Sequence, residues 1–328
     1  MSKIVLKLPS GRYELGAKLG SGNHSGVYLA KHLATGTECA VKLEKLSHRT
    51  PMLLYESKVL RQLQRAPKRK PLLLITCRGF ATNGDYNCMG MDLAGPTLDD
   101  ILTIRKKLSL TAVLKVADQL VERFEQLHDK GWLHRSVKPP NIVLGHRSGE
   151  LAGKVLIIDF GRANKYRRDL NSKKQHIPYR EDTGRRYQGP YFSVNACLGT
   201  EYSRRDDMVA LGYVLIKLLR GSLPWDELAN LPWEMLAKKS STSVEQLCAG
   251  LPPEFALYMT HCLTLKFAAS PDYAYLRELF RSRFSATQGA RSAGKAGWSD
   301  WPFNSAPPAT PATAAQGSRK RKAEAEPS

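Results

Sequence analysis

The sequence predicts an α+β protein of two lobes, in which a small, mainly antiparallel β lobe precedes a larger, mainly helical lobe. Residues 12–43 alternate apolar and polar side chains between glycines, which is typical of short strands. Beyond residue 98, apolar side chains recur at every third or fourth position, as they do on one face of a helix. A chain of 328 residues, 42% of them hydrophobic, is long enough to bury a sizeable core.

The β lobe is expected to contain several strands and one helix. A glycine followed by a proline at residues 95–96 marks a turn, and the lobe is expected to end near it. The predicted strands are residues 13–19, 27–30, 39–43 and 86–93, and the predicted helix is residues 52–63.

The second lobe begins with a long amphipathic segment. Its apolar stripe runs from Val113 to Leu127 and stops at residues 130–131, where a lysine and a glycine end a helix favourably. Further helices are predicted at residues 207–219, 253–265 and 273–284.

Three parts of the chain follow from these patterns. Residues 1–11 are an N-terminal extension, and residues 12–285 are a domain with an N-lobe (12–94) and a C-lobe (95–285). Residues 286–328 are rich in Ala and Pro and contain a basic run at residues 319–322, and they lack the apolar content that offsets the entropy of ordering. This tail is predicted to be disordered.

Composition excludes several classes of protein. No apolar run is long enough to span a bilayer, and no small-residue cleavage site for secretion follows the first residues. The six cysteines have no C-x-x-C spacing, so they are expected to be reduced thiols. An intracellular protein of the nucleus or the cytoplasm is expected, and the run RKRK at residues 319–322 resembles a nuclear-import signal.

A glycine-rich segment lies between two predicted strands and reads GSGNHSGV. Glycines let backbone N–H groups come close to the phosphates of a nucleotide. The spacing departs from G-x-G-x-x-G because the third glycine comes one residue late, so altered loop closure is expected. The predicted phosphate-binding residues are Gly20, Ser21, Gly22, Gly26 and Val27.

Charged and amide side chains that phosphoryl transfer needs then follow in order. Lys42 ends a predicted strand, where it would pair with the α- and β-phosphates, and Glu56 on the next helix would hold it. Asp159 opens a D-F-G triplet 18 residues after Asn141, and their oxygens suit Mg²⁺. Each residue alone would be read as a surface charge, but this order favours ligands of a nucleotide and its metal.

Residues 134–141 read HRSVKPPN, which matches H-R-D-x-K-x-x-N except that Ser136 replaces the aspartate; Lys138 is retained. With these motifs the chain resembles the protein kinases and, within them, is similar to the casein kinase I family. The resemblance covers about residues 10–285. The closest stretches are GPTLDD at 95–100, QHIPYRE at 175–181, SRRDDM at 203–208, LGYVL at 211–215, GSLPW at 221–225 and DYAYLRELF at 272–280.

The resemblance implies a bilobal protein-kinase fold that holds ATP and Mg²⁺ between its lobes. It implies that Met91 is the gatekeeper, that the backbone of residues 92–94 forms the adenine-binding hinge, and that Asp207 braces the catalytic loop. The implied ATP-binding residues, besides the glycine-rich segment, are Ala40, Lys42, Glu56, Met91, Asp92 and Leu93, and the implied metal ligands are Asn141 and Asp159.

Two departures from the family pattern bear on catalysis. At Ser136 an uncharged hydroxyl replaces the general base, whose contribution is about 10²–10⁴ in rate, or ~3–5 kcal/mol of barrier. Residues 187–191 align with the family's G-T-A-R-Y segment. There Gln188 replaces a threonine that bonds to the catalytic aspartate and lysine, and Pro190 replaces an arginine that helps to bind phosphorylated substrates. A slow residual reaction through Lys138 and the metal ligands is still expected.

Three functional hypotheses follow. The leading one is an ATP- and Mg²⁺-binding pseudokinase, or a strongly impaired serine/threonine kinase, that is monomeric and acts through protein partners. The second is an active kinase of acidic or already phosphorylated protein substrates. The third uses the net charge of +20 to bind nucleic acid or chromatin on a kinase fold, although a solvated basic surface explains the same charge.

Overall fold

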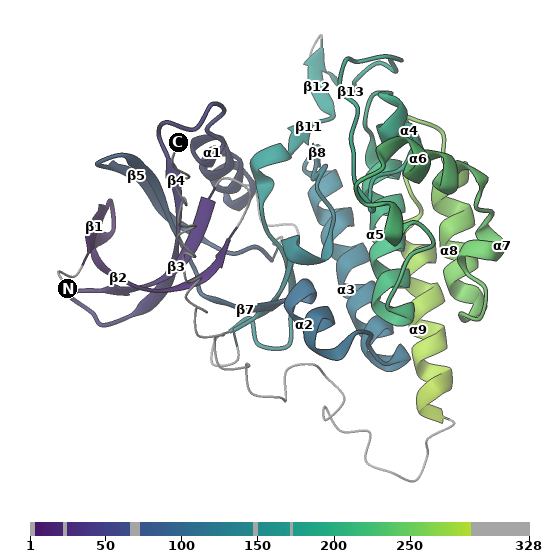
Figure 1. Cartoon of the computed structure of the whole chain (residues 1–328), viewed down its shortest axis with the longest axis horizontal. Helices are drawn as coiled ribbons and strands as arrows, with labels where there is room; N and C mark the ends of the chain where they lie inside the picture. Colours follow the sequence, from purple (N-terminus) through teal and green to yellow (C-terminus); the bar gives the residue numbers. More distant parts are fainter. Residues whose placement is uncertain (1–3, 22–24, 66–72, 147–149, 171–172, 290–328) are drawn as a thin grey trace, which may run out of the picture.

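The computed structural model of the chain describes residues 4–21, 25–65, 73–146, 150–170 and 173–289. They form two lobes, a smaller one built on an antiparallel sheet and a larger helical one (Figure 1). The predicted α+β, bilobal fold is therefore confirmed. The tail was predicted to be disordered from residue 286, but residues 286–289 form the end of a helix (Tyr273–Gly289). The residues from 290 on lie outside the described part.

The sheet of the N-lobe has the order β1-β2-β3-β4-β6-β5, and all its neighbouring strands are antiparallel. The extension expected for residues 1–11 contributes the first strand, because Leu6 and Leu8 are buried in a small core of the sheet. This strand is too short for its alternation to be separated from a loop by sequence. The strands are β1 (Val5–Leu8), β2 (Gly11–Ser21), β3 (Ser25–His32), β4 (Glu38–Lys45), β5 (Cys77–Asn83) and β6 (Tyr86–Met91).

Helix α1 (Leu53–Gln64) of the N-lobe begins at a carboxylate supplied by the sheet. The side chain of Glu44 on β4 accepts hydrogen bonds from the N–H groups of Met52 (2.8 Å) and Leu53 (3.1 Å). These donors have no partner within a helix, and a negative charge is favourable at a helix N-terminus. Glu44 therefore fixes the start of α1 against the strand that carries Lys42.

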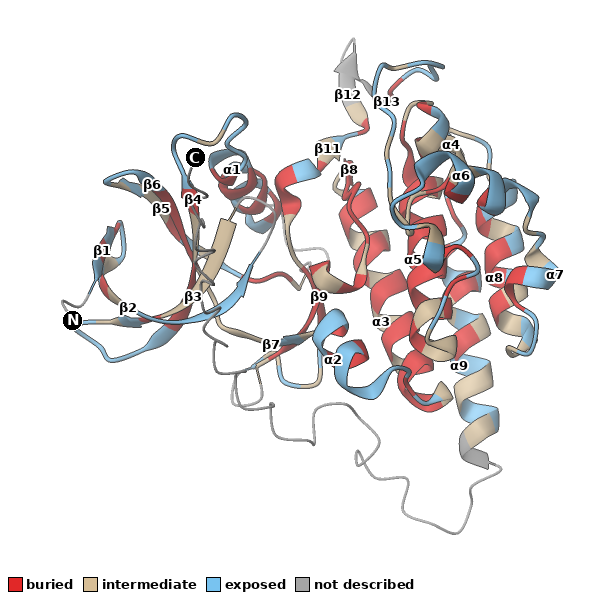
Figure 2. Ribbon diagram, viewed as in Figure 1, coloured by how far each residue is buried: buried red, intermediate tan, exposed pale blue. Residues whose placement is uncertain are grey.

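The core of the C-lobe surrounds helix α3, whose predicted apolar stripe is buried in the largest hydrophobic cluster (Figure 2). Ser109 caps this helix by accepting a hydrogen bond from the N–H group of Ala112 (3.3 Å). Gly131, with φ of +81°, turns the chain away after its end. The helices are α2 (Leu98–Arg105), α3 (Leu110–Asp129), α4 (Val194–Leu198), α5 (Arg204–Arg220), α6 (Pro232–Ser241), α7 (Val244–Leu247), α8 (Pro253–Thr264) and α9 (Tyr273–Gly289).

Short strands at the lobe boundary carry the loops of the candidate site. Strands β9 (Ile142–Gly145) and β10 (Val155–Ile157) are antiparallel, and Ile142 pairs with Ile157. The residues just before β9 and just after β10 therefore lie at the same end of this hairpin. The other short strands are β7 (Ala94–Thr97), β8 (Trp132–Leu133), β11 (Asn164–Lys165), β12 (Arg167–Leu170) and β13 (Lys173–His176), and a 3₁₀ turn spans Pro139–Asn141.

No helix in the described part of the chain is both long and apolar enough to cross a membrane. All six cysteines are free thiols, as the absence of paired spacing predicted.

Close packing of α5 against α8 requires a glycine at position 212. A Cβ atom there would lie 2.2 Å from the sulfur of Met259 and 2.9 Å from the ring of Tyr258. We predict that Gly212→Ala lowers the free energy of unfolding by about 1–3 kcal/mol, because overpacking outweighs the better helix propensity of alanine. Urea unfolding measures this change. The control is Gly20→Ala, whose Cβ would meet no atom within 4 Å; equal stability of the two variants would contradict the packing argument.

Candidate functional site

Three charged residues that are far apart in the sequence meet between the lobes. The Lys42 ammonium on β4 lies 2.7 Å from the Glu56 carboxylate on α1 and 3.3 Å from the Asp159 carboxylate that follows β10. The side chains of Lys42 and Glu56 are only 16% and 5% exposed. The order of residues predicted these partners, and the structure brings them together.

The two carboxylates stabilise the charge of Lys42, although burial and the neighbouring Asp159 raise the pKa of Glu56 above its usual value. Burial alone would lower the pKa of Lys42, but the carboxylates of Glu56 and Asp159 outweigh it and raise the pKa above its usual value. Burial would raise the pKa of Asp159, but Lys42 and His134 lower it below its usual value. Lys42 therefore stays protonated and Asp159 ionised at neutral pH, which is the state needed to hold phosphates and a metal ion.

Asp159 is directed toward Lys42 by the phenylalanine that follows it. Phe160 is fully buried and packs edge-on against the ring of His134, with 5.1 Å between the ring centres. Asp159 itself has φ of +66°, in the left-handed region that a non-glycine residue adopts only where its surroundings impose it. Burial of the Phe160 side chain thus orients the neighbouring carboxylate of Asp159.

The catalytic loop is held in place by Asp207, which lies at the start of α5. Its carboxylate accepts hydrogen bonds from the backbone N–H groups of His134 (2.8 Å) and Arg135 (2.9 Å). It also accepts bonds from His128 (3.1 Å) and from the hydroxyl of Tyr202 (2.9 Å). Burial would raise the pKa of Asp207, but these hydrogen bonds lower it. The bracing role implied for Asp207 is confirmed.

Ser136 lies in this loop, where it is 6% exposed and bonded to Asn141. The amide nitrogen of Asn141 donates to the backbone oxygen of Ser136 (2.9 Å) and to its hydroxyl oxygen (3.1 Å). Within the described residues the amide oxygen of Asn141 accepts no hydrogen bond, so it could act as a ligand of a metal ion. Lys138 directly precedes the 3₁₀ turn Pro139–Asn141.

The two predicted metal ligands lie at one end of the β9–β10 hairpin. The backbone oxygen of Asn141 accepts a hydrogen bond from the N–H group of Ile158, the residue before Asp159 (2.9 Å). No group of three or more His, Cys, Asp or Glu side chains that could hold a metal ion occurs in the described residues. One carboxylate and one amide oxygen fit Mg²⁺, which is usually bound through few protein groups and the phosphates of a substrate.

The glycine-rich segment joins β2 to β3 at the edge of the candidate site. Gly20 pairs with Val27, and Ser21 pairs with Gly26, while Gly22 lies outside the described residues. A Cβ atom on Gly26 would lie 2.7 Å from the ring of Tyr28. The late glycine of this motif therefore makes room for a neighbouring aromatic ring, a packing need that the motif did not reveal.

The predicted hinge is tied to the N-lobe sheet by Asp92. Its carboxylate accepts hydrogen bonds from the side chain of Arg78 (2.8 Å) and from the backbone N–H group of Thr76 (3.1 Å). The side chain of Asp92 therefore has a structural role in fixing the hinge. The other hinge residue predicted to bind ATP, Leu93, is half-buried between Asp92 and β7.

Two further positions predicted to line the adenine site lie side by side in the sheet. Ala40 on β4 is buried and pairs with Met91, the last residue of β6. Met91 is half-buried and packs against apolar residues of both lobes. The predicted gatekeeper therefore stands where the sheet meets the C-lobe.

The segment before α4 is held by donors that sequence reasoning missed. The Lys239 ammonium on α6 donates to the backbone oxygens of Gly189 (2.7 Å) and Phe192 (2.9 Å), and the indole N–H group of Trp225 donates to that of Pro190 (2.8 Å). Burial lowers the pKa of Lys239 to about 8. These pairs are 35 to 50 residues apart in the chain, so no local pattern could have indicated them.

The same segment touches the catalytic loop through Arg135. Its guanidinium donates to the hydroxyl of Tyr187 and stacks on the rings of Tyr187 and Tyr202, with 5.4 and 5.8 Å to the ring centres. Gln188, which was predicted to replace a catalytic threonine, is exposed. Residues 186–192, here called the activation segment, therefore contact Arg135, the residue before Ser136.

We predict that Asp207→Asn lowers the free energy of unfolding by about 3 kcal/mol or more. The new amide N–H₂ group would face buried donors of the catalytic loop, and each buried donor left without a partner costs about 1–3 kcal/mol. Urea unfolding followed by tryptophan fluorescence gives the change. The control Asp118→Asn removes partly exposed ion pairs with Arg277 and Arg281 and should cost about 1 kcal/mol or less. An equally small loss of stability for Asp207→Asn would refute the bracing role of Asp207.

Comparison with known families agrees with this arrangement of side chains. The chain matches the model of the protein kinase domain over residues 13–264, which is more than half of its 328 residues. The matched region contains the sheet of the N-lobe, the Lys42 cluster and the catalytic loop braced by Asp207. The chain belongs to the protein kinase family.

Proposed function

We propose that the chain is a casein-kinase-I-like homologue that binds ATP and Mg²⁺, is strongly impaired in phosphoryl transfer, and acts through protein partners. The observation that carries the proposal is a contrast. The Lys42–Glu56–Asp159 cluster is complete, whereas the position that would hold the general base carries the neutral hydroxyl of Ser136.

Nucleotide binding is assigned to the residues whose charges are already in place. The Lys42 ammonium, held by Glu56, would contact the α- and β-phosphates. Asp159 and Asn141 would hold Mg²⁺, which when bound neutralises charge on the phosphates. These contacts need no proton transfer, so they are compatible with a serine at position 136.

Phosphoryl transfer requires more than binding. The acceptor hydroxyl must be oriented and must lose its proton, and a serine hydroxyl is far too weak a base at neutral pH. The hydroxyl oxygen of Ser136 also accepts a hydrogen bond from Asn141. The carboxylate of Asp159 is paired with Lys42. The same site can therefore bind a nucleotide while lacking the group that speeds phosphoryl transfer.

We predict that ATP with Mg²⁺ raises the melting temperature of the chain, because a ligand that binds only the folded state stabilises it by about 2.7 kcal/mol at 100 times Kd. Lys42→Met should remove most of the shift, and chelation of Mg²⁺ should reduce it. The control Lys58→Met changes an exposed lysine on α1 and should leave the shift intact. Absence of any shift in the native chain would refute nucleotide binding.

We further predict that Ser136→Asp increases phosphate transfer from radiolabelled ATP to casein or to the chain itself by about 10²–10⁴-fold, since it restores a general base. The melting shift with ATP checks that the variant still binds nucleotide, and Lys42→Met in the same background should abolish transfer. Lys42-dependent turnover by the native chain at an ordinary enzyme rate of about 1–10³ s⁻¹ would instead identify an active kinase.

A further inference from the structure

One hydrogen bond joins the start of α1 to the chain beyond the D-F-G triplet. The hydroxyl of Tyr55 donates to the backbone oxygen of Ala163, and 2.7 Å separates the two oxygen atoms. Tyr55 directly precedes Glu56, and Ala163 follows Asp159 by four positions. This bond therefore joins the two parts of the chain that carry the carboxylates paired with Lys42.

The 3₁₀ turn Phe160–Arg162, here called the D-F-G turn, packs against α1. Side chains of the N-lobe bond to the chain on both sides of this turn. Lys42 bonds to Asp159 before it, and Tyr55 bonds to Ala163 after it. The turn is thus held against the N-lobe at both of its ends.

The cluster at Lys42 contains more negative than positive charge. Two carboxylates, those of Glu56 and Asp159, face one ammonium group. Burial and the neighbouring Asp159 raise the pKa of Glu56 above its usual value. Repulsion between the two carboxylates therefore opposes the close approach of α1 to the D-F-G turn when no cation is bound.

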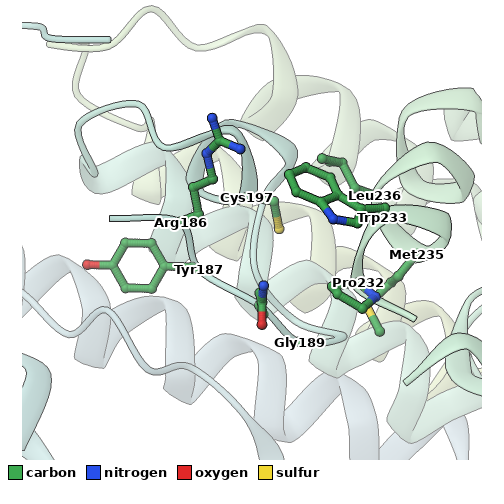
Figure 3. A pocket seen from close by; sticks show the side chains of 9 residues that line it. Arg186, Tyr187, Gly189, Cys197, Pro232, Trp233, Met235 and Leu236 are labelled. Atoms are coloured by element: carbon green, nitrogen blue, oxygen red, sulfur yellow. The ribbon is translucent and has the colours of Figure 1, made fainter. Parts of the chain in front are cut away.

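The activation segment is held by the C-lobe and not by α1. The side chains of Lys239 and Trp225 donate to its backbone oxygens. Its Tyr187, whose ring points away from α6 in Figure 3, bonds to Arg135 of the catalytic loop. Within the described part of the chain, Tyr55 is the one α1 side chain that is hydrogen-bonded to a residue beyond the D-F-G triplet. A directional link between α1 and that part of the chain therefore rests on Tyr55.

We propose that Tyr55 is a positioning residue whose hydrogen bond to Ala163 holds α1 against the D-F-G turn and keeps Glu56 on Lys42 before any nucleotide binds. The hydroxyl of Tyr55 is bonded to a backbone oxygen, so this residue acts through Glu56 and not by contact with phosphates or a metal ion. The inference deepens the proposed nucleotide binding, because a preorganised site loses less entropy on binding. Its test needs no nucleotide.

The test measures how fast acetic anhydride acetylates Lys42 at pH 8 in the full chain without nucleotide, by mass spectrometry of its peptides. When Glu56 moves away, the pKa of Lys42 falls and a larger fraction of neutral amine reacts. We expect Tyr55→Phe to speed this reaction about 2–10-fold, as expected for the loss of one hydrogen bond. Tyr275→Phe removes the hydroxyl of a tyrosine on α9 that is equally exposed (39%), and it should react like the native chain.

A second lysine separates positioning from a general loosening of the fold. Lys239 is 5% exposed and belongs to α6 of the C-lobe, so its acetylation reports opening of the fold away from α1. The rate at Lys239 should be the same in Tyr55→Phe and in the native chain, while the rate at Lys42 rises.

A double substitution shows whether Tyr55 acts through Glu56. In a Glu56→Gln background Lys42 already lacks the carboxylate of α1, so adding Tyr55→Phe should change the acetylation of Lys42 by less than about twofold. Multiplication of the two single effects would show instead that Tyr55 acts independently of Glu56.

Three results would each overturn the positioning role. These are equal acetylation of Lys42 in the native chain and in Tyr55→Phe, a parallel rise at Lys239, and independent effects of Tyr55→Phe and Glu56→Gln. Protection of Lys42 by ATP with Mg²⁺ in the native chain tests the proposed function separately. Absence of that protection would count against nucleotide binding and would leave the result for Tyr55 unaffected.

Discussion

The buried ammonium of Lys42 is the constraint on which the rest of the site depends. A charge that is largely removed from water must be compensated, and Glu56 and Asp159 supply that compensation from a helix and from a loop of the other lobe. Each partner is placed by a further interaction: α1 starts on Glu44, and Asp159 is oriented by burial of Phe160. The sheet, α1 and the C-lobe are therefore joined through one cation.

Ser136 stands in a loop whose other parts are intact. Asp207 holds the backbone of the loop, and the side chain of Asn141 bonds to Ser136. The backbone oxygen of Asn141 accepts a hydrogen bond from Ile158, the residue before Asp159. These bonds form with an uncharged serine at position 136. The proposed separation of nucleotide binding from fast transfer is therefore compatible with this architecture, because different atoms serve the two tasks.

The activation segment shows the same separation between architecture and chemistry. Its backbone oxygens accept hydrogen bonds from the side chains of Lys239 and Trp225. Its conformation is therefore fixed without a contact to a catalytic carboxylate.

The local sequence pattern was sufficient to predict several helices of this protein and the residues of its nucleotide site. Period and glycine placement predicted α3, α5, α8 and α9, and the order of Lys42, Glu56, Asn141 and Asp159 predicted a nucleotide site before any geometry was known. Tertiary structure alone decided that residues 5–8 join the sheet, that Arg78 holds Asp92, and that Lys239 supports Gly189. The physical reason is the distance along the chain over which each interaction acts. The periodicity of apolar residues indicates which face of a helix or strand is buried. A hydrogen bond between residues 50 apart in the sequence depends instead on how those faces pack in the folded protein.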